Sequence, residues 1–326
     1  MTKRQSRMQD RSKRVTKLSS GFRVSTYRPT PEGFDPTKAT KRQLILHGIP
    51  PRPDASKDPD LRSRWDQAIA KTKRWIIPEF LEIPGKTHGL AKKIGTKSRR
   101  KLAGLTNATS ANWSGAVDFP PTGAAYFWAA GQWTVPNPHA PGSGAYYASE
   151  WVGIDGWNSA DVCQAGTETQ ITNVLWFTVK NVYPWWEWFP SGEVAITNLP
   201  VAAGDVMYCL ICVSASNAAS IYLSNQSTGD GTSFDITAPS GTSLVGDSVE
   251  WIIERPGVNG TTASLSEYGV GYFDECLAGS LGSAGFGADN LHSATAVTMT
   301  GAGGKTLSSP TIENDNVLKL EWKGAS

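Results

Sequence analysis

Short apolar segments that alternate with polar residues recur along the chain after residue 106. Four clear examples cover residues 125–135, 173–182, 205–215 and 219–227. Turn-forming sequences such as STGDGTS and GVNG separate such segments. Short strands divided by frequent turns predict an all-β fold, either a sandwich or a barrel, and no fixed-period repeat accompanies them.

A helical periodicity precedes residue 106. In residues 56–76, Leu61, Trp65 and Ile69 recur at i, i+4 and i+8, and Pro59 suits a first helical turn. This spacing predicts an amphipathic helix.

Two further predictions concern the N-terminal part. A shorter helix is predicted over residues 40–47, where Gly48 would stop it. Residues 1–36 are basic and contain few apolar side chains, so we expect them to lack a fixed structure.

The segment VEWIIE at residues 249–254 combines an apolar strand pattern with two carboxylates. In a strand, Glu250, Ile252 and Glu254 would share one face. The opposite face would carry Val249, Trp251 and Ile253. The Glu face could simply meet water, since exposed Glu is common on strands. The alternative is that this face lines a cleft.

Charge divides the chain at the same point as the periodicity. Residues 1–106 hold 26 Lys and Arg against 9 Asp and Glu, a net charge of +17. Residues 107–326 hold 5 against 20, a net charge of −15, and contain eleven of the thirteen Trp. This asymmetry predicts a basic leader, residues 1–106, and an acidic β domain, residues 107–326.

Several classes of function find no support in the sequence. No apolar run is long enough to span a membrane, and no recognisable secretory signal follows the basic N-terminus. Cys209 and Cys212 have CxxC spacing but would face opposite sides of a strand, so we predict no metal site. His139 and His292 show no triad or metal-ligand pattern. Nucleic-acid binding would rest on the leader's charge alone.

Carboxylates and carboxamides lie close to Trp in three stretches, residues 149–170, 183–190 and 249–254. Aromatic surroundings lower the local dielectric and raise the pKa of a carboxylic acid. We interpret Glu150, Glu168 and Glu193 as incidental neighbours of a Trp-rich core.

The order of these motifs resembles that of the glutamic peptidases, or eqolisins. The motifs are ANWSGAV (111–117), WVGIDG (151–156), CQAG (163–166), WWEWFP (185–190) and VEWIIE (249–254). The resemblance is clear over residues 107–260. Over residues 261–326 it rests on the length of the chain and the style of the strands. It implies a sandwich of two antiparallel sheets, of the concanavalin-like jelly-roll type, and an acid-acting endopeptidase that needs no cofactor.

Transferred by motif, the resemblance makes Glu250 the catalytic carboxylate and Gln164 its partner. Trp151 and Asp155 would frame the cleft beside Gln164. Trp185 and Glu187 would form the neighbouring wall.

The chain departs from the family at one nearby position. Tyr183 stands where the fungal secreted members carry an acidic residue, two positions before the Trp that corresponds to Trp185. Secretion is implied by family analogy, and polypeptides would be the substrates of a monomeric enzyme.

The chemistry of these two residue types agrees with peptide hydrolysis. Glu has an ordinary pKa of about 4.3, which an apolar site raises, so Glu250 could accept a proton from water and return it to the leaving nitrogen. The Gln164 amide could donate to the oxyanion while its carbonyl orients the water.

The basic leader is interpreted as a propeptide and intramolecular inhibitor. It would dock electrostatically on the acidic domain and loosen in acid as carboxylates become protonated. We predict cleavage between residues 95 and 110, in a basic stretch. A solubilising or nucleic-acid-binding tail is the alternative.

Two other functions compete with the peptidase. A jelly-roll glycoside hydrolase would use Glu187 and Glu250 as its carboxylate pair and Trp as sugar platforms. A carbohydrate-binding module would use the same Trp without turnover. Neither requires Gln164.

Overall fold

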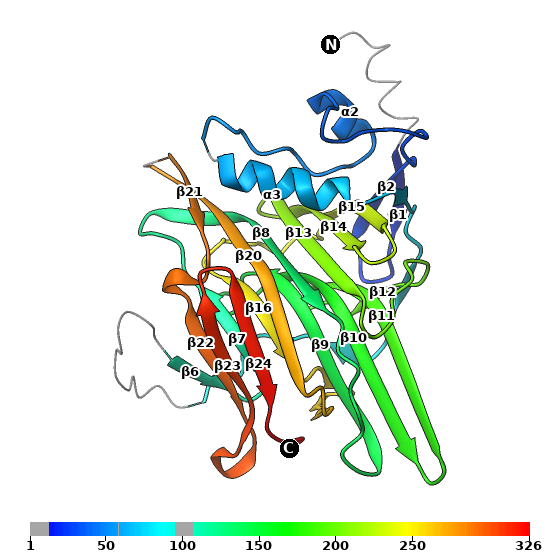
Figure 1. Cartoon of the computed structure of the whole chain (residues 1–326), viewed down its shortest axis with the longest axis vertical. Coiled ribbons are helices and arrows are strands. Elements are labelled where there is room, and N and C mark those ends of the chain that lie inside the picture. The colour runs from blue at the N-terminus through cyan, green and yellow to red at the C-terminus, as the bar shows by residue number, and fades with distance from the viewer. Residues whose placement is uncertain (1–12, 58, 95–106, 284) are drawn as a thin grey trace.

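The computed structural model describes residues 13–57, 59–94, 107–283 and 285–326, and it is a sandwich of two mostly antiparallel β-sheets (Figure 1). In spatial order, the first sheet contains β6 (Asn107–Ser110), β22 (Thr295–Thr300), β7 (Trp113–Asp118), β16 (Val249–Glu254), β9 (Gly144–Ile154), β10 (Val162–Val174), β11 (Phe177–Phe189), β12 (Val194–Ile196) and β4 (Phe80–Glu82). The predicted all-β sandwich is therefore confirmed.

The second sheet lies behind the first. In spatial order, it contains β21 (Gly285–Asp289), β20 (Val270–Gly282), β8 (Ala124–Thr134), β13 (Val206–Ala215), β14 (Ala218–Asn225), β15 (Asp230–Thr237), β2 (Arg23–Tyr27) and β1 (Lys13–Lys17). Strand β3 (Arg74–Trp75) pairs in parallel with β15.

Short elements complete the fold. The hairpin of β23 (Thr306–Asn314) and β24 (Val317–Trp322) connects β22 to β20 at one side of the sandwich. Strand β19 (Ser264–Leu265) pairs with β9, and a small sheet contains β18 (Thr261–Thr262), β17 (Gly257–Val258) and β5 (Lys86–Thr87). The 3₁₀ turns are η1 (Leu291–Ser293) and η2 (Ala302–Gly304).

Alternation along the strands decides what each face buries. On β16, Val249, Trp251 and Ile253 enter the core between the sheets, while Ile252 packs on the opposite face with Trp151 and Trp185. The same rule places Cys209 in the central core and Cys212 on the outer face of the second sheet. All four cysteines are buried free thiols.

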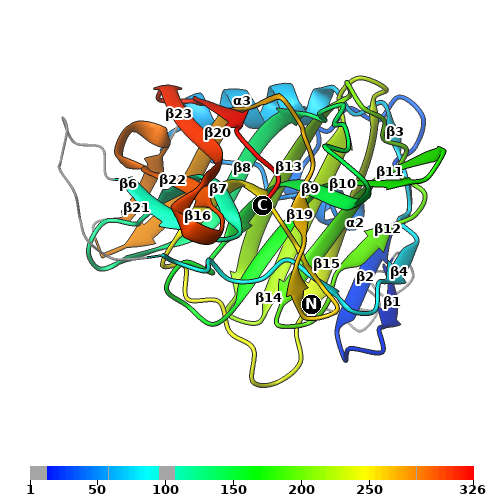
Figure 2. The same ribbon diagram turned by 90° about the horizontal axis from the view of Figure 1, so that it is seen from below.

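The leader contributes two helices, α2 (Lys41–Leu46) and α3 (Pro59–Ala70). Both were predicted, although α3 ends six residues before the predicted limit because Arg74 and Trp75 form β3. Leu61, Trp65 and Ile69 are buried against the outer face of the second sheet. Figures 1 and 2 show α3 lying along that side of the sandwich.

The prediction that residues 1–36 lack structure is wrong for residues 13–27. Strand β2 adds to the open edge of β15, and β1 adds to β2, so backbone pairing orders a segment that is poor in apolar side chains. Phe22 and Val24 also enter the central core. Residues 1–12 lie outside the described part of the chain.

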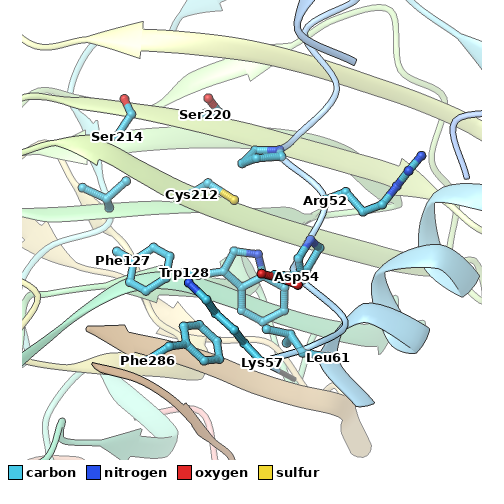
Figure 3. Close-up of a pocket in the computed structure, with 13 residues that line it drawn as sticks. Arg52, Asp54, Lys57, Leu61, Phe127, Trp128, Cys212, Ser214, Ser220 and Phe286 are labelled. Carbon is cyan, nitrogen blue, oxygen red and sulfur yellow. The ribbon is translucent and has the colours of Figure 1, made fainter. Parts of the chain in front are cut away.

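A cavity of about 350 Å³ separates part of the leader from the second sheet (Figure 3). Arg52, Asp54 and Lys57 line it from the leader, and Trp128 and Cys212 from the sheet. The leader therefore packs closely through α3 but less completely beside it. Among the described residues, no helix has the length and apolar character needed to cross a membrane.

Candidate active site

Strand register places Glu250 and Gln164 in one row on the outer face of the first sheet. Gly153 on β9 pairs with Glu250 of β16 on one side and with Gln164 of β10 on the other, and Gln164 pairs with Glu187 of β11. Directly paired residues point to the same face of a sheet. The carboxylate and the carboxamide therefore lie on either side of a glycine.

Gly153 leaves the space between these two side chains open. A Cβ atom at this position would lie 2.7 Å from Cζ3 of Trp151 and 3.4 Å from Cβ of Gln164. The first distance is shorter than real Cβ contacts, so a larger residue would displace the indole. Glycine thus lets Glu250 and Gln164 face one another.

Glu250 is fully buried, and neither of its carboxylate oxygens has a hydrogen-bond partner among the described residues. Burial raises the pKa of this carboxyl well above 4.5, and the negative charges of Asp155 and Asp247 raise it further. Such a group keeps its proton to a higher pH than an exposed Glu does.

Gln164 is also fully buried, and its amide contacts the leader. Nε2 donates to the main-chain carbonyl of His88 at 2.5 Å. Its Oε1 has no partner within the described residues. The carboxamide therefore already donates to a peptide carbonyl.

Trp151 and Trp185 occupy the next level of the same face, where both pair with Gly166. Trp151 Nε1 donates to Glu254 at 3.0 Å, and its ring packs edge-on against Trp113. Both Trp151 and Trp185 are completely buried. They form an apolar surface one level along the strands from Gln164, and their role in the cleft stays a prediction.

Asp155 lies at the end of β9 with a positive φ of 72°. Its carboxylate accepts backbone N–H groups from Val245, Gly246 and Asp247 at 2.7, 3.1 and 2.7 Å. It therefore holds the loop that leads into β16, and through it the position of Glu250.

Glu187 receives a main-chain hydrogen bond from the leader. Its Oε2 accepts the N–H of His88 at 2.8 Å, and burial raises its pKa well above 4.5. Glu187 and Gln164 thus hold the two backbone polar groups of one leader residue.

The His88 side chain is buried against side chains of the first sheet. Its ring stacks on Trp185 with centroids 3.6 Å apart and planes 10° apart. Nε2 lies 2.7 Å from Glu193, and Nδ1 lies 3.7 Å from Glu254. Burial lowers the pKa of His88, but these two carboxylates outweigh it and raise the pKa to about 10. His88 is therefore an imidazolium.

Lys86 enters the same acidic region two residues earlier. Its Nζ lies 3.0 Å from Glu168 and 3.4 Å from Glu193, and donates to the Tyr183 hydroxyl at 2.8 Å. Tyr183 in turn donates to Glu193 at 2.8 Å. The tyrosine thus supports the carboxylate network through its hydroxyl.

The interpretation of Glu168 and Glu193 as incidental core residues is wrong, because both contact the leader's cations. Glu150 differs, since it points into the sandwich, where the Thr167 hydroxyl donates to it at 3.1 Å.

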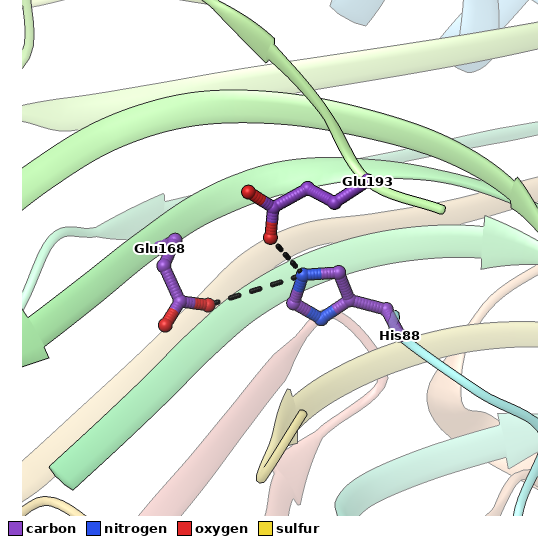
Figure 4. A group of neighbouring side chains, drawn as sticks. All are labelled: His88, Glu168 and Glu193. Carbon is purple, nitrogen blue, oxygen red and sulfur yellow. Dashed lines mark hydrogen bonds and ion pairs between the residues drawn. The ribbon is translucent and has the colours of Figure 1, made fainter. Parts of the chain in front are cut away.

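His88, Glu168 and Glu193 also present three potential metal ligands within 4.8 Å of one another (Figure 4). The Lys86 ammonium lies 3.0 and 3.4 Å from the Glu168 and Glu193 carboxylates and already compensates their charge. The cluster is therefore better explained as a buried ion-pair network.

Sequence reasoning missed His88, Glu193 and Glu254 as site residues. Glu254 could have been found, because it shares a strand face with Glu250. His88 had no comparable signal, since only the folded leader brings it to the cleft.

Comparisons with known proteins identify the family and the fold. The Peptidase A4 family profile matches residues 111–322. Scytalido-glutamic peptidase with a transition-state analogue inhibitor is similar with a TM-score of 0.56 and 20% identity, covering 65% of this chain and 98% of that one.

A second similar structure is SCP-B, a member of the eqolisin family, in a complex with the tripeptide Ala-Ile-His. It has a TM-score of 0.51 and 18% identity, with coverage of 65% and 98%. No curated protein sequence matches. At these identities the structures establish the fold, whereas the profile covers most of the chain, which therefore belongs to the Peptidase A4 family and is a peptidase acting on polypeptides.

Proposed function

We propose that the protein is an acid-acting endopeptidase in which Glu250 is the general base and acid and Gln164 stabilises the oxyanion. The observation that carries this assignment is the 2.5 Å hydrogen bond from Gln164 Nε2 to the His88 carbonyl, in the same row as Glu250. A peptide carbonyl held there is polarised by a neutral donor that lies two strands from Glu250, whose carboxyl oxygens have no hydrogen-bond partner among the described residues.

The reaction follows from these positions. Glu250, as carboxylate, takes a proton from a water molecule whose oxygen attacks the carbonyl carbon, and Gln164 Nε2 donates to the resulting oxyanion. Glu250 then returns the proton to the leaving nitrogen as the C–N bond breaks. One preorganised oxyanion donor accelerates such reactions by roughly 10²–10³.

We further propose that the leader is an inhibitory propeptide. It lies over Gln164 and Glu187 and uses the donor that a substrate carbonyl would need. Its charge of +17 opposes the domain's −15. The predicted cleavage range of 95–110 lies mostly in residues 95–106, outside the described part of the chain.

The glycoside hydrolase alternative is less well supported. Glu187 and Glu250 are three strands apart with Gln164 between them, about 14 Å between backbones at ordinary strand spacing. Glu187 is also engaged by the His88 amide.

Digestion of an unfolded protein substrate at about pH 4 and pH 7 tests the assignment, since Glu carboxyls titrate across this range. Wild type would be compared with Glu250→Gln and Gln164→Ala. The matched controls are Glu313→Gln, at an exposed position, and Gln170→Ala, on the same strand as Gln164.

We expect acid-dependent cleavage in wild type and both controls. Glu250→Gln should abolish it, and Gln164→Ala should reduce it by roughly 10²–10³. Undiminished activity in folded Gln164→Ala would refute the dyad.

A further inference from the structure

The leader crosses the cleft as an extended main chain held on both sides of the His88–Gly89 bond. Before it, the Lys86 carbonyl accepts the N–H of Glu193 at 3.1 Å, and the His88 N–H donates to Glu187. After it, Trp113 Nε1 donates to the Gly89 carbonyl at 3.1 Å. Asn112 Nδ2 continues the series by donating to Leu90 at 3.2 Å.

These contacts involve backbone groups that any polypeptide carries. The Gln164 amide donates to His88 and not to a neighbouring carbonyl. If Gln164 is the oxyanion donor, as proposed above, His88 occupies the place of the residue whose carbonyl is attacked. Its side chain then marks the adjoining subsite.

That subsite is built for a flat cation. Trp185 provides a parallel aromatic surface, and Glu193 and Glu254 approach opposite nitrogens of the ring. All three side chains are buried and belong to the first sheet and its loops. They remain part of the cleft when the leader leaves it.

A neighbouring region accepts a second cation two residues before His88. Lys86 Nζ contacts Glu168, Glu193 and the Tyr183 hydroxyl, and it lies 5.1 Å from the Tyr147 ring centroid. Burying these carboxylates without cationic partners would be costly, so the cleft favours ligands that supply them.

We propose that the peptidase prefers polypeptides with histidine immediately before the cleaved bond, bound as imidazolium by Trp185, Glu193 and Glu254. Lysine two residues earlier adds to the preference through Glu168 and Glu193. Water adds its hydroxyl to the histidine carbonyl carbon and, through Glu250, its remaining proton to the nitrogen that leaves as the C–N bond breaks. The leader is thus bound as a substrate analogue of this class.

The full-length protein is first held below about pH 4 until the leader is released and cut, and it is then assayed at about pH 4, where free histidine is charged. The peptide IPGKTHGLAKK, which copies residues 83–93, is compared with the same peptide carrying His88→Leu. Both kcat/KM and the cleaved bond, found by mass spectrometry, are measured for wild type, Glu193→Gln and Glu313→Gln. An unfolded protein substrate is digested in parallel.

A charged hydrogen-bond partner changes binding by about tenfold to a hundredfold. We therefore expect cleavage after His88, a His-to-Leu kcat/KM ratio of about 10–100 in wild type and Glu313→Gln, and a ratio near 1 in Glu193→Gln. A ratio near 1 in wild type, or cleavage at another bond, would overturn the subsite while leaving the peptidase intact. Failure to digest the unfolded protein as well would instead refute the proposed function.

Discussion

At the residue scale, the proposed chemistry depends on the missing side chain at Gly153. Glu250 and Gln164 can act on one carbonyl only if nothing stands between them, and an added Cβ would collide with the Trp151 ring while it touches Gln164 at an ordinary contact distance of 3.4 Å. We predict that Gly153→Ala lowers the free energy of unfolding by about 1–3 kcal/mol, the usual cost of overpacking. Its kcat/KM should fall by about 100-fold, since displacements near 1 Å have that effect.

Denaturant unfolding and digestion of an unfolded protein would measure both effects. Gly142→Ala is the matched control, because its Cβ would meet only the Tyr146 hydroxyl, at 3.1 Å. Full activity in Gly153→Ala would show that the space between Glu250 and Gln164 is not where the reaction occurs.

The sequence predicted individual residues unevenly. Glu250 and Gln164 lie in recognisable motifs, and alternation correctly placed Val249 and Trp251 away from Glu250. His88 could not be predicted, because its role comes from a chain path joining segments about a hundred residues apart. The sequence also does not indicate which acidic residues pair with the leader cations Lys86 and His88.

At the element scale, α3 fixes the leader to the sandwich through one large side chain. Trp65 is fully buried on the outer face of the second sheet, whereas Lys86 and His88 contact the first sheet. We predict that Trp65→Ala weakens leader docking by about 3–5 kcal/mol, as for other buried Trp residues. The cavity beside α3 leaves few other leader contacts there to compensate.

Trypsin cleavage of the leader in a Glu250→Gln background would measure this loss without self-digestion. The leader should be cut faster in Trp65→Ala, whereas Ile45→Ala, at a half-exposed position on α2, should leave the rate unchanged. A single cooperative loss of the whole fold would instead show that leader and sandwich are not separable units.

Elements with strong periodicity were predictable, and those created by pairing were not. The spacing of Leu61, Trp65 and Ile69 is a local signal, so α3 followed from it. Strands β1 and β2 carry no such signal, because their order depends on the open edge of β15. An edge strand of this kind becomes visible only when the sheet that offers the edge is known.

At the scale of the whole molecule, protonation of two groups of carboxylates has opposite effects on leader docking. One group favours the docked state when it is protonated, and the other favours release. Burial raises the pKa of Glu168 to about 7 despite Lys86 and His88, and it also raises the pKa values of Glu187 and Glu254. Groups whose pKa is raised by the leader's presence bind protons better when it is docked. Protonation of Glu168 near pH 7, and of Glu187 and Glu254 above the ordinary pKa of Glu, therefore favours the docked state.

Glu193 and Asp230 act in the other direction. Burial raises the pKa of Glu193, but His88 and Lys86 outweigh it and lower the pKa below 4.5. Arg74 of the leader lowers the pKa of Asp230 below 3.8. Each contributes docking free energy above its ordinary pKa and loses it as the pH falls through the lowered value.

We therefore predict that the leader stays docked from pH 7 to about pH 5 and is released only below about pH 4, as Glu193 and Asp230 are protonated. Hydrogen exchange of residues 83–94 in full-length Glu250→Gln, corrected for intrinsic rates, would follow release without cleavage. Strand β13, in the central core, provides the internal reference. Adding Glu193→Gln should weaken protection at every pH and flatten its acid dependence, because the carboxylate that titrates is gone. Loss of protection between pH 7 and pH 5 would mean that Glu168 controls release and that the sign of its linkage is the reverse of that derived from its burial.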